Sequence, residues 1–341
     1  MTTAVIGQPI SRVDGRQKVT GRATYAAEFE VPNVAHAAIV RSTIANGRIA
    51  SIDSAAAEGA PGVVAVLTHR DAPRLAYRHH KAFVDPDIGE RLHVLRDDRV
   101  SHQGQPIALV IADGLEQANH AATLVRVIYA PETAITDLAR VEPVRPTRQQ
   151  TDQGERRPSE TRRGNAEEAL AGAQVQIEQT YVIPRENHNP IEMHATIAAW
   201  DGDRLTLWDK TQWVHNTADE IAAVFGIPAE NVRVVSPFVG GAFGSGLRTW
   251  PHVTLAALGA RVAGRPVKLM LSRREMYYGV GYRPHTIQRV ALGASRDGRL
   301  AAIVHDGYQE TSTYEEFTEA LLRPTQFLHS CPNVYTRHRL A

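Results

Sequence analysis

The sequence predicts a mixed α/β protein of two domains. Two observations support the fold class. Short runs rich in β-branched residues alternate with segments of helical periodicity, and a polar stretch at residues 143–164 divides this alternation into two halves. The length agrees, since 341 residues exceed the usual domain size of about 100–150 residues. We expect one domain at residues 1–142 and a second at residues 165–341.

The first domain is expected to be a compact α/β unit. Its strands are predicted at residues 35–41, 63–67, 105–113 and 125–129. Residues 45–60 indicate a turn followed by a short helix. Residues 115–125 indicate a longer helix, because alanines recur along one of its faces. A polar loop rich in His and Asp, residues 70–90, separates the second strand from the third.

Residues 143–164 are expected to form an exposed linker. The stretch is polar, is interrupted by proline and glycine, and has almost no large apolar side chains. It therefore cannot supply a core of its own. We interpret it as a solvated connector rather than as a docking segment for a partner.

The second domain continues the alternation of helices and strands. Helices are predicted at residues 165–170, 217–225 and 253–262. Strands are predicted at residues 175–183, 193–200, 204–208, 232–235, 266–271, 288–292 and 300–305. Gly226 and Gly264 follow the two longer helices. Glycine is common at such ends because it adopts the left-handed conformation without steric cost.

Residues 235–248 (VSPFVGGAFGSGLR) connect a predicted strand to a predicted helix. Glycines let backbone N–H groups approach a ligand, and a helix N-terminus adds partial positive charge, so the stretch suits an anion such as phosphate. Two common phosphate loops are excluded. A Walker loop requires Lys and Ser or Thr where Leu247 and Arg248 stand, and a dinucleotide fingerprint requires glycine in place of Thr249. A tight connection without a ligand is the alternative.

Charge and cysteine content limit the function classes. The 38 basic and 37 acidic residues nearly cancel, which argues against nucleic acid or an anionic membrane as the main partner. No apolar run approaches the roughly 20 residues of a membrane span, and no export signal opens the sequence. We expect a cytoplasmic protein, with export alongside a partner left open. Cys331 is the only cysteine. The chain alone therefore cannot hold an iron–sulfur cluster, and we expect a buried or half-buried thiol.

Several motifs follow one another along the chain. They are residues 12–25 (RVDGRQKVTGRATY), 104–113 (GQPIALVIAD), 188–192 (HNPIE), 211–212 (TQ), 240–244 (GGAFG) and 283–285 (RPH). In order and spacing, the chain resembles the large, molybdenum-binding subunit of the xanthine dehydrogenase and aldehyde oxidase family over nearly its whole length. The resemblance implies an α/β hammerhead-like first domain, followed by the first, incomplete part of a molybdopterin-binding domain.

The resemblance also implies a molybdenum–molybdopterin cofactor, with or without a cytosine nucleotide. Gln212 matches the glutamine that hydrogen-bonds an oxygen on the molybdenum. Its amide suits this role, because it offers a donor and an acceptor without charge. The family's cofactor-binding loop is matched by Gly240, Gly241, Ala242, Phe243 and Gly244. In this family the pterin dithiolene holds the metal, so no side chain is expected as a metal ligand.

Glu192 is interpreted first as a structural residue, with Arg185 as a candidate ion-pair partner. The spacing of His188, Glu192 and His194 also permits a metal site, since alternate positions of a strand would place Glu192 and His194 on one face. The sequence leaves both interpretations open.

Two departures from the family pattern bear on the substrate. Gly246 and Leu247 stand where the family loop continues to a lysine and, in the xanthine-oxidising branch, to a glutamate. Leu247 therefore points to an aldehyde-like or apolar substrate rather than a purine. Arg248 is expected either to contact a phosphate or to face solvent.

The family continues beyond the segment that holds Cys331 into a second half. That half supplies another arginine-containing loop, further cofactor contacts and the general-base glutamate, whereas this sequence ends at Ala341. We expect part of a molybdenum hydroxylase that oxidises an aldehyde or N-heterocycle with water-derived oxygen. It would need the missing C-terminal half, together with iron–sulfur and FAD subunits, since neither cofactor is expected on this chain. The alternative is a non-catalytic module that binds pterin phosphate or partner subunits without turnover.

Overall fold

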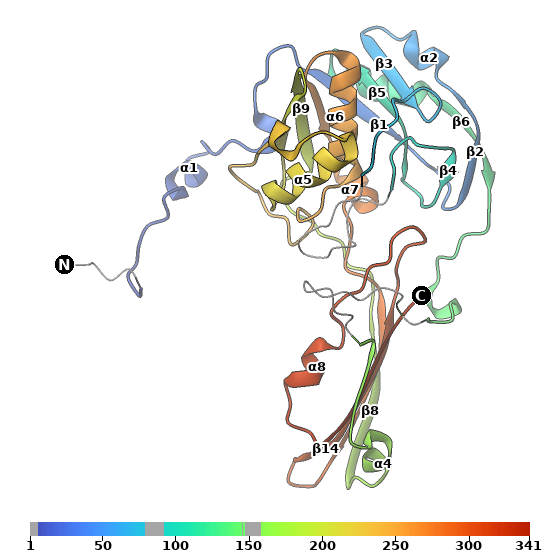
Figure 1. Cartoon of the computed structure of the whole chain (residues 1–341), viewed down its shortest axis with the longest axis vertical. Helices are drawn as coiled ribbons and strands as arrows, with labels where there is room; N and C mark the ends of the chain where they lie inside the picture. The colour runs from blue at the N-terminus through green and yellow to red at the C-terminus, as the bar shows by residue number, and fades with distance from the viewer. Residues whose placement is uncertain (1–5, 79–91, 145, 147–157) are drawn as a thin grey trace.

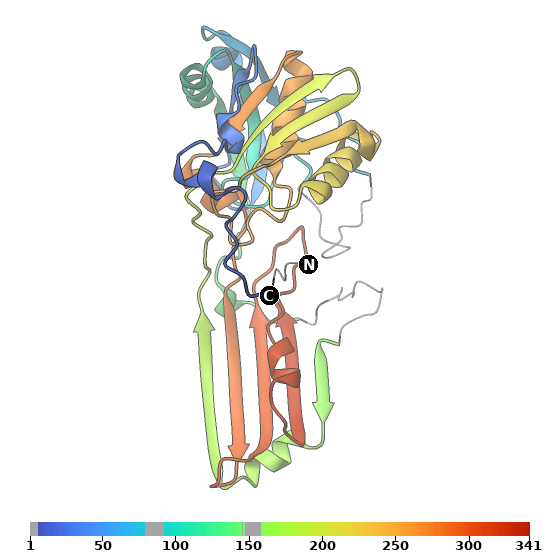
Figure 2. The same ribbon diagram turned by 90° about the vertical axis from the view of Figure 1, so that its left-hand side faces the viewer.

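The computed structural model describes residues 6–78, 92–144, 146 and 158–341. Two bodies are joined end to end (Figures 1 and 2). One holds a seven-stranded and a three-stranded sheet with most of the helices, and the other holds an elongated five-stranded sheet. The predicted mixed α/β class is confirmed. Residues 79–90 of the predicted loop and most of the predicted linker lie outside the described residues.

The seven-stranded sheet combines strands from both halves of the chain, in the order β11-β10-β9-β12-β1-β5-β3. Its members are β1 (Ala35–Arg41), β3 (Val63–Thr68), β5 (Pro106–Ala112), β9 (Ala195–Asp201), β10 (Arg204–Asp209), β11 (Val232–Val235) and β12 (Val267–Met270). β10 is parallel to β11, and both β10 and β12 are antiparallel to β9. The carboxyl ends of β10, β11 and β12 therefore meet at one edge of the sheet.

Helices cover this sheet, and α6 (Pro251–Ala263) is the most deeply placed, since residues 252–260 are all buried. A Cβ added to Gly259 would lie 3.2 Å from Leu109 Cδ2, so α6 packs closely on β5. The other helical segments of this body are α1 (Gly15–Val19), η1 (Ala26–Glu28), α2 (Ala55–Glu58), α3 (Leu115–Leu124), α5 (Val214–Phe225), η3 (Ala229–Asn231) and α7 (Arg273–Gly279). No helix in the described ranges is long and apolar enough to cross a bilayer.

The three-stranded sheet places β2 (Gly47–Asp53) between β4 (Arg99–Val100) and β6 (Arg126–Pro131). The predicted turn and short helix at residues 45–60 is therefore wrong for its first part. Ile49 and Ile52 are both buried although they stand three residues apart, a spacing typical of a helix. A register shift between Ile49 and Ser51 brings both isoleucines to the buried side of the strand.

The five-stranded sheet has the order β7-β15-β14-β13-β8. Its strands are β7 (Glu160–Arg163), β8 (Val175–Ile183), β13 (Thr286–Ala294), β14 (Leu300–Gln309) and β15 (Asn333–Leu340), with α4 (Ala166–Ala171) and α8 (Arg323–Phe327) beside them and η2 (Leu138–Arg140) before β7. β7 lies within the segment expected to be a linker, and its backbone pairs with β15. β8 forms an edge and is exposed along its whole length.

Candidate functional site

The glycine loop, defined here as residues 236–250, leaves the carboxyl end of β11 and enters α6. Gln212 follows the carboxyl end of the neighbouring strand β10, so the predicted strand–loop–helix arrangement is confirmed and brings these motifs together. In sheets with parallel strands, ligands bind in the crevice outside such carboxyl ends. The position of the loop in the fold therefore favours a binding site.

The loop has an unusual backbone. Gly241, Phe243 and Gly244 all have positive φ, at 89°, 55° and 96°. A left-handed phenylalanine costs on the order of 1 kcal/mol or more, because its Cβ crowds the backbone. The Phe243 side chain is also 74% exposed. A strained and exposed aromatic residue in a glycine-rich loop favours a ligand-binding role over core packing.

Buried side chains anchor the loop from beneath. His194 Nε2 lies 3.1 Å from Ser245 Oγ, and Ser245 Oγ donates to Ala242 O at 2.8 Å. Trp250 Nε1 donates to Ser245 O at 2.6 Å. Ser245 is 1% exposed, so it acts as the internal anchor of the loop. Sequence reasoning missed Ser245, for which its position between two glycines was the only signal.

Gln212 joins the loop to the end of β10. Its backbone N–H donates to Gly246 O at 2.8 Å, and its side-chain Oε1 accepts from Gly246 N at 3.2 Å. Thr211 Oγ1 also donates to Gly246 O, at 3.1 Å. Gln212 is exposed, and its Nε2 has no hydrogen bond within the described part of the chain. The amide thus keeps a free donor group at this edge of the sheet.

Glu192 holds the other end of the loop. Gly240 N–H donates to Glu192 Oε2 at 2.6 Å, and Glu192 N–H donates to Gly240 O at 3.2 Å. Burial raises the pKa of Glu192, and the Gly240 N–H and the nearby Lys210 oppose that shift. Arg185 instead pairs with Glu310 at 2.7 Å. The structural interpretation of Glu192 therefore fits this geometry, whereas the partner expected for it is wrong.

The N-terminal motif, residues 12–25, contacts the same loop. The Tyr25 and Phe238 rings are 6.2 Å apart, and Lys18 Nζ lies 5.7 Å from the centre of the Phe238 ring. A Cβ on Gly240 would lie 2.7 Å from Glu192 Cβ and 3.4 Å from Tyr25 Cε1. Only glycine fits there without displacing these neighbours, so motifs far apart in sequence shape one loop.

Several buried polar atoms around this edge have no hydrogen-bond partner among the residues that the structure describes. They are Asn187 Oδ1, His188 Nδ1, Glu192 Oε1, Lys210 Nζ, Thr249 Oγ1 and both ring nitrogens of His252. Buried polar groups are normally satisfied, so a concentration of free donors and acceptors fits a polar ligand. Burial lowers the pKa of His194 to about 2 and that of His252 to about 3, which keeps both rings neutral near pH 7.

The metal interpretation of His188, Glu192 and His194 is not supported. His194 contacts Ser245, and Glu192 binds the Gly240 N–H. No group of three or more His, Cys, Asp or Glu side chains in the described ranges is arranged to hold a metal ion. Cys331 is buried, with its Sγ 3.3 Å from Asn333 O, which confirms the expected structural thiol.

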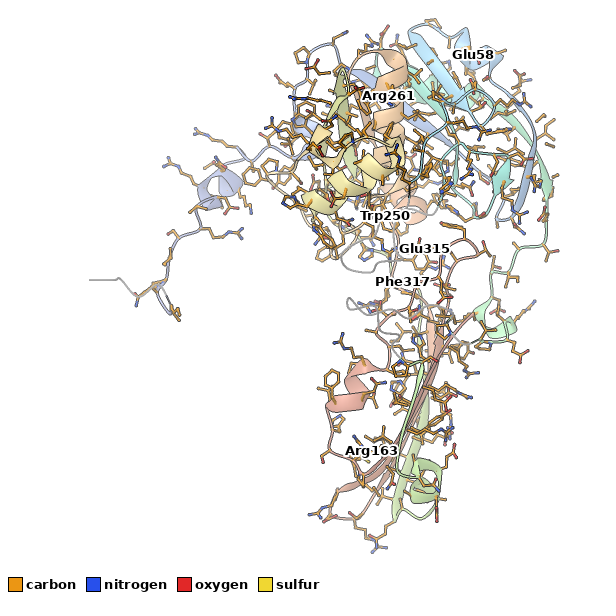
Figure 3. The ribbon with its side chains drawn as sticks, viewed as in Figure 1. Glu58, Arg163, Trp250, Arg261, Glu315 and Phe317 are labelled. Atoms are coloured by element: carbon orange, nitrogen blue, oxygen red, sulfur yellow. The ribbon has the colours of Figure 1, made fainter. Side chains whose placement is uncertain are left out.

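Arg248 does not face solvent freely, as one of the two expectations for it required. Its guanidinium pairs with the Glu315 carboxylate and lies 5.0 Å from the centre of the Phe317 ring. Trp250, Glu315 and Phe317 lie where the two bodies meet (Figure 3). Arg248 therefore ties the glycine loop to the segment that follows β14. Leu247 is 40% exposed and adds an apolar surface beside the Arg248–Glu315 ion pair.

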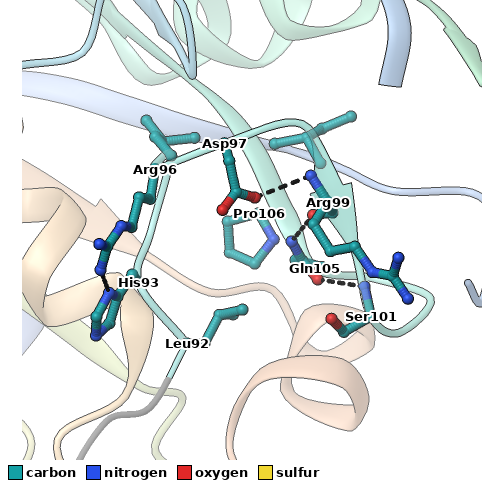
Figure 4. Close-up of a pocket in the computed structure, with 10 residues that line it drawn as sticks. Leu92, His93, Arg96, Asp97, Arg99, Ser101, Gln105 and Pro106 are labelled. Carbon is teal, nitrogen blue, oxygen red and sulfur yellow. Dashed lines mark hydrogen bonds between the residues drawn. The ribbon is translucent and has the colours of Figure 1, made fainter. Parts of the chain in front are cut away.

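A separate pocket lies on the first half of the chain (Figure 4), lined by residues between Leu92 and Ile107. Its polar groups satisfy one another. Gln105 Nε2 donates to Arg99 O at 2.7 Å, and Gln105 Oε1 accepts from Ser101 N at 2.8 Å. None of the predicted site residues lines it, so we interpret it as loop packing rather than as the functional site.

Comparisons with known proteins agree with this geometry. Residues 149–341 match the model of the molybdopterin cofactor-binding domain, and residues 20–133 match the aldehyde oxidase and xanthine dehydrogenase a/b hammerhead domain. The aldehyde oxidoreductase molybdenum-binding subunit PaoC of Escherichia coli K12 is 35% identical over 99% of this chain and 44% of its own length. The xanthine dehydrogenase molybdenum-binding subunit of Escherichia coli O157:H7 is 31% identical over 89% of this chain and 41% of its own length.

The aldehyde oxidoreductase of Desulfovibrio gigas superposes with a TM-score of 0.78 at 26% identity, over 97% of this chain and 38% of its own. The chain thus spans less than half the length of these relatives. The hammerhead domain followed by a molybdopterin-binding domain, expected from the motifs, is confirmed. The chain belongs to the family of molybdenum-binding subunits of the aldehyde oxidoreductases and xanthine dehydrogenases.

Proposed function

We propose that this chain forms the glycine-loop side of the molybdopterin site in a molybdenum hydroxylase. One observation carries the proposal. A strained glycine loop, bonded to Gln212 and Glu192, lies at the same sheet edge as a group of buried polar atoms without partners. The match of residues 149–341 to a molybdopterin cofactor-binding domain supports this cofactor class.

The bound molybdenum–pterin group would supply two-electron oxidation and oxygen transfer. The chain's own groups bind and orient it. Gln212 Nε2 is the free donor for an oxygen near the metal, and the backbone around Phe243 is exposed for contact with the pterin. The general base, the remaining cofactor contacts and the iron–sulfur and FAD partners are assigned to the rest of the complex.

The substrate is proposed to be an aldehyde or an apolar N-heterocycle. Leu247 presents an apolar and partly exposed side chain beside the loop, where a carboxylate would be needed to orient a purine. The relative with 35% identity is an aldehyde oxidoreductase subunit, which favours the aldehyde. Turnover of aromatic aldehydes, compared with xanthine, by the purified complex tests this assignment.

Gln212→Ala in the assembled complex tests the site. Loss of one preorganised donor lowers turnover by roughly 100-fold in comparable sites, and we expect a loss of that order with molybdenum content retained. Gln176→Ala is the matched control, because Gln176 is another exposed glutamine that lies on β8, away from the glycine loop, where its Nε2 donates to Ala171 O and Ala173 O. Unchanged turnover of the Gln212 variant would contradict the assignment. A complex that holds the cofactor and oxidises no substrate would favour the non-catalytic alternative.

A further inference from the structure

Arg248 is the only charged residue in the sequence of the glycine loop. It directly follows Leu247, the side chain proposed above to lie beside the substrate. Gly246, two residues before Arg248, donates its N–H to Gln212 Oε1 at 3.2 Å. Consecutive Cα atoms are about 3.8 Å apart, so the Arg248 Cα lies within about 8 Å of the Gly246 Cα. A guanidinium without a counter-charge would therefore make this part of the proposed site positive.

An acidic segment after β14, residues 310–319, supplies that counter-charge. Three of its glutamates pair with arginines from three other parts of the chain: Arg185–Glu310 at 2.7 Å, Arg283–Glu319 at 3.5 Å, and Arg248–Glu315. The Arg185 and Arg283 side chains are 51% and 56% exposed, whereas that of Arg248 is 26% exposed and that of Glu315 is 17% exposed. Solvent screens a partly buried pair much less than an exposed one. Glu315 is therefore the group that neutralises the glycine loop.

The acidic segment is held in place by bonds that do not involve the glycine loop. Gln309, at the end of β14, is fully buried, and its Nε2 donates to Phe317 O at 3.0 Å. The Glu315 N–H donates to Ser312 Oγ at 2.9 Å, and Ser312 Oγ donates to Glu315 O at the same distance. Glu315→Gln leaves all of these bonds possible. The substitution therefore removes one negative charge and keeps the segment that carries it.

We infer that Glu315 is a specificity-determining residue, which neutralises Arg248 so that the site does not attract aldehydes that carry a carboxylate. The inference rests on the proposed function. Without Glu315, the guanidinium would attract an anionic substrate over several ångströms, because charges near a protein surface interact more strongly than in bulk water. An ion pair that only joins the two bodies predicts a different outcome. Breaking such a pair would change the turnover of charged and uncharged aldehydes by the same factor.

The test compares kcat/KM for 4-formylbenzoate with kcat/KM for benzaldehyde in the purified complex. The ratio of the two measures discrimination by charge, and a general loss of activity cancels from it. Glu315→Gln is expected to raise this ratio by about 10-fold, and about 1 M NaCl should reduce the gain. Arg248→Gln should lower the ratio, because it leaves the Glu315 carboxylate without its partner. A double variant with both substitutions should return the ratio to the wild-type value.

Glu178→Gln is the matched control. It removes the same charge from the Arg289–Glu178 pair, whose atoms are 2.7 Å apart and which joins β13 to β8 in the other body. It should leave the ratio unchanged.

A second readout is independent of bound cofactor. In the purified full-length subunit without cofactor, phenylglyoxal should modify Arg248 about 3-fold faster in Glu315→Gln than in wild type, because no carboxylate then holds the guanidinium. Modification of Arg289 in the same samples, mapped by mass spectrometry, should not change.

An unchanged substrate ratio in Glu315→Gln, or a raised ratio that persists in the double variant, would overturn the inference. Loss of molybdopterin from the Arg248→Gln complex would also overturn it, because Arg248 would then be assigned to the cofactor phosphate. A complex that oxidises neither aldehyde would instead contradict the proposed function. The modification rates of Arg248 would then decide the inference: equal rates in wild type and Glu315→Gln would overturn it, and a faster rate in the variant would support it.

Discussion

Two groups of buried polar side chains differ in how their hydrogen bonds are satisfied. On the five-stranded sheet, His305 Nδ1 lies 2.8 Å from Thr325 Oγ1, and His305 Nε2 lies 3.0 Å from Gln288 Oε1. His338 Nε2 lies 3.1 Å from Gln309 Oε1, and Gln309 Nε2 donates to Phe317 O at 3.0 Å. These bonds hold the segment after β14 against the sheet.

At the site edge of the seven-stranded sheet, some side chains are equally buried but have no hydrogen-bond partner among the described residues. His252 is 2% exposed and neither of its ring nitrogens has such a partner, and the Lys210 ammonium also has none. Burial alone therefore does not identify a functional polar residue. The satisfied group stabilises the fold, whereas the unsatisfied group fits the ligand site that we propose.

Substitution of one left-handed glycine by valine in each body should show the largest difference between the bodies. The quantity compared is the molybdopterin content of the complex. Gly241 has φ +89° and lies in the glycine loop, whereas Gly298 has φ +85° and lies in the turn between β13 and β14. Both substitutions strain the backbone by a similar amount. We expect Gly241→Val to lower the molybdopterin content of the complex by about 100-fold, because the loop backbone can no longer approach the cofactor.

Gly298→Val should leave that content unchanged, since no atom lies within 4 Å of the added Cβ. Pterin analysis of the purified variants measures both. Equal cofactor content in the two variants would show that the glycine loop is only a connection between β11 and α6.

Replacing one histidine from each group of buried polar side chains tests whether the two groups differ in their contribution to stability. His305→Leu leaves Thr325 Oγ1 and Gln288 Oε1 without their partner, so we expect a loss of about 1–3 kcal/mol in the free energy of unfolding. His252→Leu breaks no hydrogen bond to any residue that the structure describes, so we expect a change of less than about 1 kcal/mol. Urea denaturation of the cofactor-free chain measures both. A larger loss for His252→Leu would mean that its nitrogens have partners in solution.

The sequence alone was sufficient to predict features that depend on residues close together in the chain. The sequence predicted a glycine loop between a strand and a helix, and β11 and α6 confirm it. Gly226 and Gly264 end their helices with φ of 71° and 63°, as expected. Motif order then identified the family, and Gln212 lies against Gly246 of the loop. β2 was missed because a register shift conceals the alternation of its side chains.

Contacts between distant segments could not be predicted in this way. Ala35 pairs with Val267, so the two halves share one sheet although a polar segment separates them in sequence. Arg248 meets Glu315 only because the segment after β14 returns to the loop. Lys210 has no local signature, and its lack of a partner becomes visible only when the surrounding side chains are placed.

Two carboxylates, the buried Asp209 and the half-buried Asp306 in the other body, should give the smallest effects on stability, with opposite signs. Burial raises the pKa of Asp209 at the site edge to about 7. Burial also acts on Asp306 of β14, but the Arg337 and Arg339 guanidiniums outweigh it and hold the Asp306 pKa below its usual value. The protonated form is therefore favoured at Asp209 and the ionised form at Asp306.

The sign of the pH dependence follows for each group. The stability that Asp209 contributes is fully present below about pH 4 and is lost as the pH rises through about 7. The stability that Asp306 contributes is present above about pH 4 and is lost as the pH falls through the lowered pKa of Asp306. At pH 8, Asp209→Asn should therefore stabilise the chain by about 1 kcal/mol, because the variant no longer ionises in a buried position.

Asp306→Asn should destabilise the chain at pH 8 by about 1 kcal/mol, because two partly buried ion pairs are lost. Thermal unfolding at pH 5 and pH 8 measures both variants. The gain from Asp209→Asn should shrink at pH 5, whereas the loss from Asp306→Asn should persist. A loss of stability in Asp209→Asn at pH 8 would mean that Asp209 is ionised and paired with Lys210, and the site edge would then be satisfied in the same way as the five-stranded sheet.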